Sequence, residues 1–272
     1  MNYQELWHRL SKVYDAGEAK ALARMLYEVR YGLSLSDLLM GRDVTVPQDE
    51  LEQLTARIER QEPIQYVLGQ ADFCGRTFKV TPAVLIPRPE TEELCRWVIE
   101  EVRGEDSILD IGTGSGCIAI TIAAELPEAK VTAWDISEEA LQVAKENAKL
   151  NGVTIDFHKQ DALAPSSPTS NLSTIVSNPP YIINKERARM EANVLNYEPH
   201  TALFVPDDDP LLFYRAIARY GLQALRSGGR LYFEINPLFA DDLQQLLRTM
   251  SYHDIEIKED QYGKQRMIRA RL

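Results

Sequence analysis

The strongest constraint on the fold is an alternation of strand-like and helix-like segments that begins at Ile108. Strands are predicted at residues 108–110, 131–134, 154–157, 174–176 and 231–235, and helices from 118 and over 137–150, 211–225 and 239–250. Such alternation specifies an α/β fold with a mostly parallel sheet that carries helices on both faces. Two last strands, near Ile255 and Met267, are too close in sequence for a crossover helix, so they should be antiparallel.

The first part of the chain has a different pattern. Apolar residues recur at helical spacing between residues 5 and 61, for example at Leu6, Leu10 and Val13. A segment rich in glycine, proline and aromatic residues follows and is typical of short strands and turns. We therefore predict a small helical recognition domain at 1–62, a β-hairpin connector at 63–86 and the α/β domain at 87–272.

Composition excludes several classes of protein. The 272 residues carry a net charge of −11, which opposes non-specific binding to nucleic-acid backbones. No run approaches the roughly 18 apolar residues of a membrane span, and no secretory signal is visible at the start, so we expect a cytoplasmic protein. The three cysteines, Cys74, Cys95 and Cys117, lack the spacing of a metal or redox motif and are predicted to be small buried side chains.

A glycine-rich loop joins the first strand of the sheet to its first helix. It reads Asp110-Ile-Gly112-Thr113-Gly114-Ser-Gly116, and its glycines allow a tight turn and a close approach by a ligand. Because ligands of open α/β sheets bind outside the carboxyl ends of the strands, the loop predicts a nucleotide-like ligand. Residues 114–119 also fit the looser dinucleotide pattern G-x-G-x-x-A.

Three acidic residues favour S-adenosylmethionine over a dinucleotide. Asp110 would repel a pyrophosphate but could attract the ammonium group of an amino-acid-bearing ligand. Asp135 ends the second strand, where a carboxylate can accept both ribose hydroxyls; its alternative role, a helix cap, can be filled by Ser137. Asp161 follows the third strand and could accept the adenine amino group.

The tetrapeptide Asn178-Pro179-Pro180-Tyr181 follows the fourth strand, at residues 174–176. An Asn side chain and a Pro carbonyl form a rigid pair of acceptors, and Tyr181 adds a flat aromatic face. Together they could hold a planar NH2 group, such as a carboxamide or the exocyclic amine of a base. The alternative is a simple turn, since Asn-Pro and Pro-Pro commonly end strands.

These motifs resemble the HemK/PrmC family, the class I methyltransferases that methylate a glutamine of peptide-chain release factors. The resemblance covers nearly the whole chain and rests on 110–116 and 178–181, together with Pro87 to Glu92, Phe73 to Arg76 and the helical N-terminal part. It implies a seven-stranded methyltransferase sheet and a helical domain that docks the release factor. The implied reaction transfers a methyl group from S-adenosylmethionine to N5 of the glutamine in a Gly-Gly-Gln motif, leaving S-adenosylhomocysteine.

The resemblance and the chemistry of the residues together define a candidate site. Catalytic roles are expected for Asn178, Pro179 and Tyr181, and substrate binding for these three and Pro180. Cofactor binding is expected for Asp110, Gly112, Thr113, Gly114, Gly116, Asp135, Asp161 and Asn178. We expect no metal, no direct nucleic-acid partner, no membrane, and a monomer whose protein substrate is a release factor.

The segment from Pro87 to Glu92 has two interpretations. Thr91 is a plausible N-cap for the helix that follows, whereas the family pattern implies that Glu90 and Thr91 close the site over the cofactor. Arg88 could be a surface charge. The loop 198–204 could fold back over the substrate, and its His200 is not assigned to catalysis.

Three other functions fit the sequence less well. An adenine-N6 methyltransferase would use the same grip on a planar amine, but the acidic composition and the absence of a long basic segment oppose it. An NAD-dependent oxidoreductase would need a hydride-transfer partner that the sequence does not show. A non-catalytic binding module would have no use for Asn178.

Overall fold

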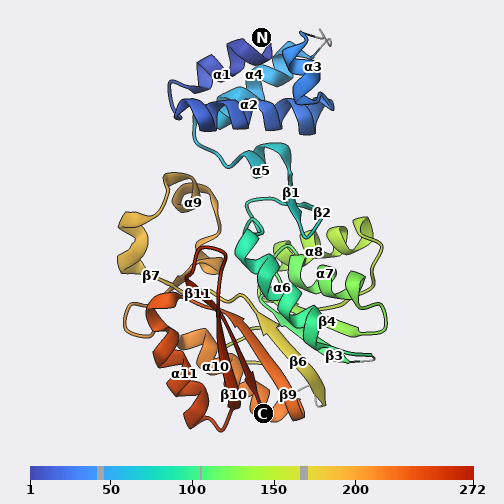
Figure 1. Ribbon diagram of the computed structural model, residues 1–272, viewed down its shortest axis with the longest axis vertical. Coiled ribbons are helices and arrows are strands. Elements are labelled where there is room, and N and C mark those ends of the chain that lie inside the picture. The colour runs from blue at the N-terminus through green and yellow to red at the C-terminus, as the bar shows by residue number, and fades with distance from the viewer. Residues whose placement is uncertain (42–45, 105, 166–170) are drawn as a thin grey trace. The chain divides into compact units, whose positions relative to one another are not determined.

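The computed structural model describes residues 1–41, 46–104, 106–165 and 171–272. These residues form two compact units, coloured along the chain in Figure 1. One unit comprises Met1–Gln70 and Glu191–Tyr197, and the other comprises Ala71–Met190 and Glu198–Leu272. In the described part of the chain no helix is both long and apolar enough to cross a membrane.

The first unit is helical. Its helices are α1 (Tyr3–Leu10), α2 (Ala16–Tyr31), α3 (Leu35–Leu39), α4 (Gln48–Glu59), α5 (Ile64–Leu68) and, from a distant part of the chain, α9 (Ala192–Tyr197). The apolar faces of α1 to α5 meet in one core around Leu6, Leu26 and Ile58. Asn2 begins α1 with a capping box, and Asp15 caps α2 by accepting from two backbone amides.

The boundaries of this unit differ from the predicted segments 1–62, 63–86 and 87–272. Ile64 and Val67 of α5 lie in the same core as Ile58, so the helical unit continues to Gln70. The hydroxyl of Tyr197 donates to the Arg60 carbonyl at 2.7 Å, which ties 191–197 to this unit. Sequence patterns do not show that a short segment so far along the chain packs with the first helices.

The second unit contains the seven-stranded sheet, in the order β10-β11-β9-β6-β3-β4-β5. Its strands are β3 (Ser107–Ile111), β4 (Lys130–Asp135), β5 (Asp156–Lys159), β6 (Leu172–Ser177), β9 (Leu225–Glu234), β10 (His253–Glu259) and β11 (Gln265–Arg271). Neighbours are parallel from β9 to β5, and β11 is antiparallel to both β9 and β10. The predicted mostly parallel sheet and its antiparallel last pair are confirmed.

Helices cover both faces of this sheet (Figure 1). On one face lie α6 (Pro89–Glu101), α7 (Cys117–Glu125) and α8 (Glu138–Leu150), and on the other lie α10 (Leu212–Ala224) and α11 (Ala240–Thr249). Successive side chains of a strand point to opposite faces of the sheet and so belong to two different apolar cores. On β9, Tyr232 packs towards α6, whereas Leu231 and Phe233 pack towards α10. The central strand β6 is buried along its whole length, as expected for a strand covered on both sides.

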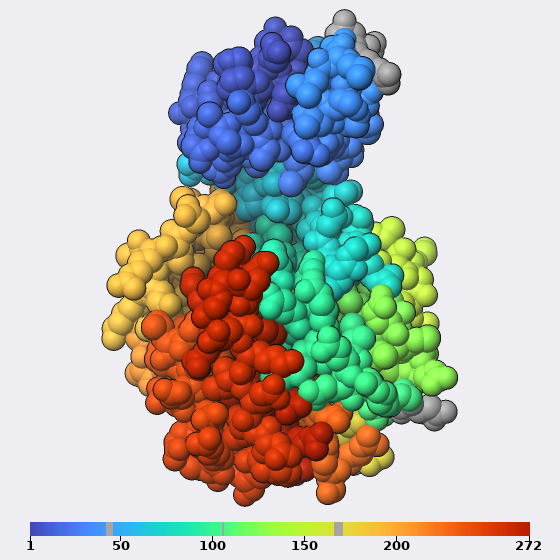
Figure 2. All heavy atoms as spheres, viewed as in Figure 1, coloured from blue at the N-terminus to red at the C-terminus, as the bar shows by residue number. Residues whose placement is uncertain are grey.

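Shorter elements complete the second unit. They are the hairpin β1 (Gln70–Phe73) and β2 (Arg76–Lys79), the parallel pair β7 (Ile182–Ile183) and β8 (Phe204–Val205), and 3-10 turns at Asn184–Arg189, His200–Ala202 and Pro237–Phe239. Figure 2 shows the β10–β11 hairpin, in red, against α6, in green. There the Gln261 amide donates to Glu93 at 3.2 Å, and Lys258 lies 4.2 Å from the centre of the Trp97 ring.

Three local predictions were wrong. The third strand runs over Asp156–Lys159 rather than 154–157, and the strand predicted at 231–235 is β9, which begins at Leu225 and ends at Glu234. Helix α6 begins at Pro89 with Arg88 as its N-cap residue, because the fixed φ of proline suits the first helical position. Thr91 therefore lies inside the first turn of α6 and is not its cap; its hydroxyl has other partners.

Candidate functional site

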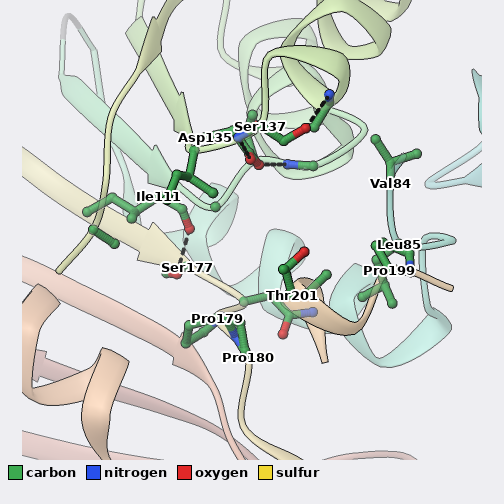
Figure 3. Close-up of a pocket in the computed structure, with 18 of the residues that line it drawn as sticks. Val84, Leu85, Ile111, Asp135, Ser137, Ser177, Pro179, Pro180, Pro199 and Thr201 are labelled. Carbon is green, nitrogen blue, oxygen red and sulfur yellow. Dashed lines mark hydrogen bonds between the residues drawn. The ribbon is translucent and has the colours of Figure 1, made fainter. Parts of the chain in front are cut away.

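A cavity of about 390 Å³ lies where β3, β4 and β6 end (Figure 3), within the size range of small-molecule sites. Figure 3 shows Asp135 and Ser137 on one side of it, Pro179 and Pro180 on the opposite side, and Leu85 and Pro199 on a third. The strand ends are held together there, since the Ser177 hydroxyl donates to the Ile111 carbonyl at 2.6 Å. The position matches the predicted binding edge of the sheet.

The glycine loop supplies part of the cavity wall through Gly112, Thr113 and Gly114. The amides of Gly112 and Thr113 both donate to the Trp134 carbonyl, which fixes the loop on β4. Gly116 is not on the wall. It begins α7 with φ +83°, and a Cβ there would lie 2.8 Å from Ile120 Cδ1 and 3.2 Å from Ala144 Cβ, so it permits close packing of α7 on α8.

Asp110 is fully buried and does not line the cavity. Its Oδ2 accepts from the Thr113 hydroxyl at 2.6 Å. Burial raises the pKa of Asp110 to about 7, although hydrogen bonds from Thr113 and the Ala119 amide act in the opposite direction. In this structure the carboxyl group lies behind the loop and is not on the cavity wall.

Asp135, in contrast, lies on the wall. Its two oxygens accept from the amides of Gly114 at 2.8 Å and Ser137 at 2.9 Å. Burial raises the pKa of this carboxyl, against the effect of these backbone donors. Ser137 caps α8 itself by accepting from the Ala140 amide at 3.1 Å, so the carboxylate of Asp135 keeps further lone pairs for a ligand.

The loop after β5 adds Gln160, Asp161, Ala162 and Leu163 to the wall. Asp161 Oδ1 accepts from the Leu163 amide at 2.8 Å, which holds the loop in a tight turn. Ile136, which is 58% exposed, also lines the cavity. This combination of apolar side chains and a polar edge is suited to a flat heterocycle.

Residues Asn178, Pro179 and Pro180 of the predicted tetrapeptide line the cavity. Asn178 Nδ2 donates to the Thr91 hydroxyl oxygen at 3.1 Å. Tyr181 is not among the residues of the wall; its hydroxyl donates to Glu234 Oε1 at 2.9 Å, and its ring packs partly buried against the core on the α10 face. The structure thus brings three of the four residues to the cavity.

Sequence analysis missed Glu234, at the end of β9. This side chain is buried, and its Oε2 accepts from the Thr91 hydroxyl at 2.6 Å. Burial raises the pKa of Glu234, while the hydroxyl donors and Arg266 oppose that shift. The available signal was a single acidic residue in the otherwise apolar run from Leu231 to Ile235, because a buried acid needs partners.

The loop 198–204 closes another side of the cavity with Pro199, Thr201, Ala202 and Phe204. Its anchor is Glu198, whose side chain is only 1% exposed and whose Oε1 lies 2.5 Å from Arg88 Nη2. Arg88, whose side chain is 33% exposed, is therefore a wall residue in a partly buried ion pair rather than a free surface charge. The ring of His200 meets Phe204 edge-on, with centroids 5.4 Å apart.

The cavity residues fit S-adenosylmethionine. A Cβ added at Gly112 or Gly114 would meet no atom within 4 Å, so the backbone presents an open concave surface to a ligand. Asp135 offers lone pairs to a ribose, and the 160–163 loop with Ile136 offers a surface for adenine. Within the described residues, no group of three or more His, Cys, Asp or Glu side chains could hold a metal ion.

Comparisons with known proteins agree with this geometry. Residues 4–69 match the PrmC N-terminal domain, and residues 93–197 match the methyltransferase small domain. A methyltransferase of Pyrococcus furiosus has a similar fold, with a TM-score of 0.55 and 17% identity over 81% of this chain and 98% of that one.

Two relatives are similar over almost their full length. One from Bacteroides thetaiotaomicron is 46% identical over 96% of this chain and 95% of its own, and one from Flavobacterium psychrophilum is 42% identical over 96% and 94%. Both are named release factor glutamine methyltransferase. Since this similarity spans the helical unit, the glycine loop and the Asn-Pro-Pro-Tyr segment, the chain belongs to the family of release factor glutamine methyltransferases.

Proposed function

We propose that this enzyme transfers a methyl group from S-adenosylmethionine to the side-chain amide nitrogen of the glutamine in the Gly-Gly-Gln motif of peptide-chain release factors. The proposal rests on the hydrogen bonding of the Asn178 side chain, which lies on the cavity wall. Its Nδ2 is bound to Thr91, and among the described residues no bond engages its Oδ1. That oxygen is available to a substrate.

The acceptor nitrogen needs orientation because an amide lone pair is delocalised into the carbonyl group. A glutamine NH2 presents two donors in one plane. Asn178 Oδ1 and the carbonyl oxygen of Pro179 would accept these two hydrogens and turn the nitrogen towards the methyl group. Holding reacting groups in this way can supply a large part of the rate enhancement.

When bound, the cofactor would supply an electrophilic methyl group on a positively charged sulfur, and the sulfur would be left as the neutral thioether of S-adenosylhomocysteine. On the acceptor side, a nitrogen–carbon bond forms and one of the two amide protons is released. That proton can leave after methylation, so the residues of the wall need only hold the amide, and no strong general base is required.

Asp135 would accept the ribose hydroxyls, and Asp161, with the loop around it, would hold the adenine. Gly112, Thr113 and Gly114 would face the cofactor directly, whereas Asp110 and Gly116 would act by shaping the loop. Tyr181 lies off the wall, so it would support the tetrapeptide through its packing against the core and its hydroxyl bond to Glu234 instead of contacting the carboxamide of the substrate. The acidic composition supports a protein substrate over a nucleic acid.

The test is incubation with methyl-labelled S-adenosylmethionine and, in parallel, a release factor, DNA and RNA. We expect label on a single glutamine of the release factor and none on a control factor in which that glutamine is replaced by glutamate. Asn178→Ala should lose most turnover while retaining cofactor binding. Label on nucleic acid alone would refute the proposal, and a fully active Asn178→Ala enzyme would refute the role of Asn178.

A further inference from the structure

A buried chain of hydrogen bonds lies behind the Asn178 side of the cavity. The Asn178 Nδ2 donates to Thr91 Oγ1 at 3.1 Å, and the Thr91 hydroxyl donates to Glu234 Oε2 at 2.6 Å. The second oxygen of Glu234 accepts from the Tyr181 hydroxyl at 2.9 Å. Glu234 thus connects both ends of the Asn-Pro-Pro-Tyr segment, although it lies more than fifty residues further along the chain.

The direction of each proton in this chain follows from the carboxylate. An ionised carboxylate can only accept, so both hydroxyls must donate to Glu234. Thr91 has one hydroxyl proton, and once that proton is given to Glu234, its oxygen can only accept from Asn178. The group of Asn178 that faces Thr91 must then be NH2, and Oδ1 must point the other way.

Burial raises the pKa of Glu234 and Glu90 on α6 acts in the same direction, whereas the two hydroxyl donors and the guanidinium of Arg266 on β11 oppose that shift. Both hydroxyls donate to Glu234, which is the arrangement that an ionised carboxylate requires. Arg266 is itself held by Asp260, at 3.4 Å. Thr91 is only 3% exposed and Glu234 only 2%, so water cannot easily replace a lost partner in this chain.

From this geometry we infer that Glu234 is a positioning residue, which acts through Thr91 to keep the Asn178 oxygen directed at the methyl acceptor and through Tyr181 to hold the aromatic ring. The inference deepens the proposed function and rests on it, because an acceptor oxygen is needed only if the substrate presents an NH2 group. Reversal of the Asn178 amide would place its NH2 against that of the substrate, donor against donor.

Four substitutions separate this role from general stabilisation. Glu234→Gln keeps the size of the side chain but places a donor where only acceptors stood. Thr91→Val removes the hydroxyl at nearly constant volume, and Thr91→Ser restores it. Glu101→Gln is the control, because Glu101 also accepts from a tyrosine hydroxyl, that of Tyr232, but unlike Glu234 it bonds to no residue of the cavity wall.

We expect kcat on the release factor to fall at least about tenfold in Glu234→Gln and Thr91→Val, about 1.4 kcal/mol in the activation barrier. Thr91→Ser should stay within about threefold of the wild type, and Glu101→Gln within about twofold, on the same scale. Binding of S-adenosylhomocysteine, measured by calorimetry, should be unchanged in all four. Thr91→Ser losing as much turnover as Thr91→Val would overturn the inference, as would a fully active Glu234→Gln.

A second readout does not depend on turnover. In protein labelled with ¹⁵N-asparagine, the Asn178 NH2 protons should be protected from exchange in the wild type and Thr91→Ser, and exposed in Thr91→Val and Glu234→Gln. Equal protection in the wild type and Glu234→Gln would overturn the inference. A wild-type enzyme that fails to methylate release factors but shows this pattern would refute the proposed substrate and leave the positioning role standing.

Discussion

Two glycines of the same loop should respond very differently to an added methyl group. Gly114, at φ +55°, lines the cavity, and a Cβ there would meet nothing within 4 Å. Gly116, at φ +83°, lies off the wall, and a Cβ there would lie 2.8 Å from Ile120 Cδ1 and 3.2 Å from Ala144 Cβ. Both positions are left-handed, but only one is crowded.

The expected magnitudes follow from these contacts. A left-handed conformation costs a non-glycine residue about 1–2 kcal/mol, and overpacking a well-filled core adds about 1–3 kcal/mol. Ile120 is fully buried and Ala144 belongs to α8, so neither can move aside freely. Gly116→Ala should therefore lower the free energy of unfolding by about 2–5 kcal/mol, and Gly114→Ala by only about 1–2 kcal/mol.

Urea unfolding followed by tryptophan fluorescence measures this difference. In a Trp7→Phe background the remaining tryptophans are Trp97 and Trp134, both buried in the second unit. Calorimetry with S-adenosylhomocysteine should rank the two variants in the opposite order for cofactor affinity. Gly114→Ala should weaken binding at least about tenfold, or 1.4 kcal/mol, whereas folded Gly116→Ala should bind normally. Equal destabilisation by the two substitutions, or weaker cofactor binding by Gly116→Ala, would refute the assignment of Gly116 to packing.

Three further predictions concern charged groups. Burial raises the pKa of Asp110 to about 7, so the folded state retains a proton that the unfolded chain loses above about pH 4. The free energy of unfolding should therefore fall as the pH rises from about 4 to about 7, by at most about 1.4 kcal/mol per pH unit from this group. Unfolding experiments at several pH values should show this fall, and Asp110→Asn should flatten it. Arg88→Met leaves Glu198 buried without its cation and should lower the thermal midpoint more than the double variant Arg88→Met/Glu198→Met does; a double variant that is no better than the single one would count against the ion pair as the anchor of the 198–204 loop. Asp135→Asn loses one of two acceptor oxygens on the wall and should weaken S-adenosylhomocysteine binding at least about tenfold, and calorimetry that finds unchanged affinity would remove Asp135 from the ribose site.

Much of the sheet could be predicted because its signals are local. Buried strands such as Leu172–Ser177 are runs of β-branched and small residues. Each is followed by a turn or by a segment whose apolar residues recur at helical spacing. The glycine loop and the Asn-Pro-Pro-Tyr segment could be placed at the binding edge for the same reason, since both directly follow strands. The antiparallel end of the sheet followed from the short connection between β10 and β11.

What could not be predicted depends on contacts between distant residues. Thr91 is a residue type that commonly caps helices, yet its hydroxyl donates to Glu234, which is 143 residues away in the sequence. Asp110 has the right position in the loop to face a ligand, but the loop folds so that Thr113 covers it. Segment 191–197 joins the helical unit through contacts such as Tyr197 with Arg60, which no periodicity in the segment itself reveals.

The most direct test of the account is mass spectrometric mapping of the methyl group after reaction with S-adenosylmethionine and a purified release factor. We predict one methyl group on the side-chain nitrogen of the glutamine in the Gly-Gly-Gln motif, formed by the wild type and lost in Asn178→Ala. A methyl group at any other residue, or an unmodified release factor beside an enzyme that binds the cofactor, would contradict it.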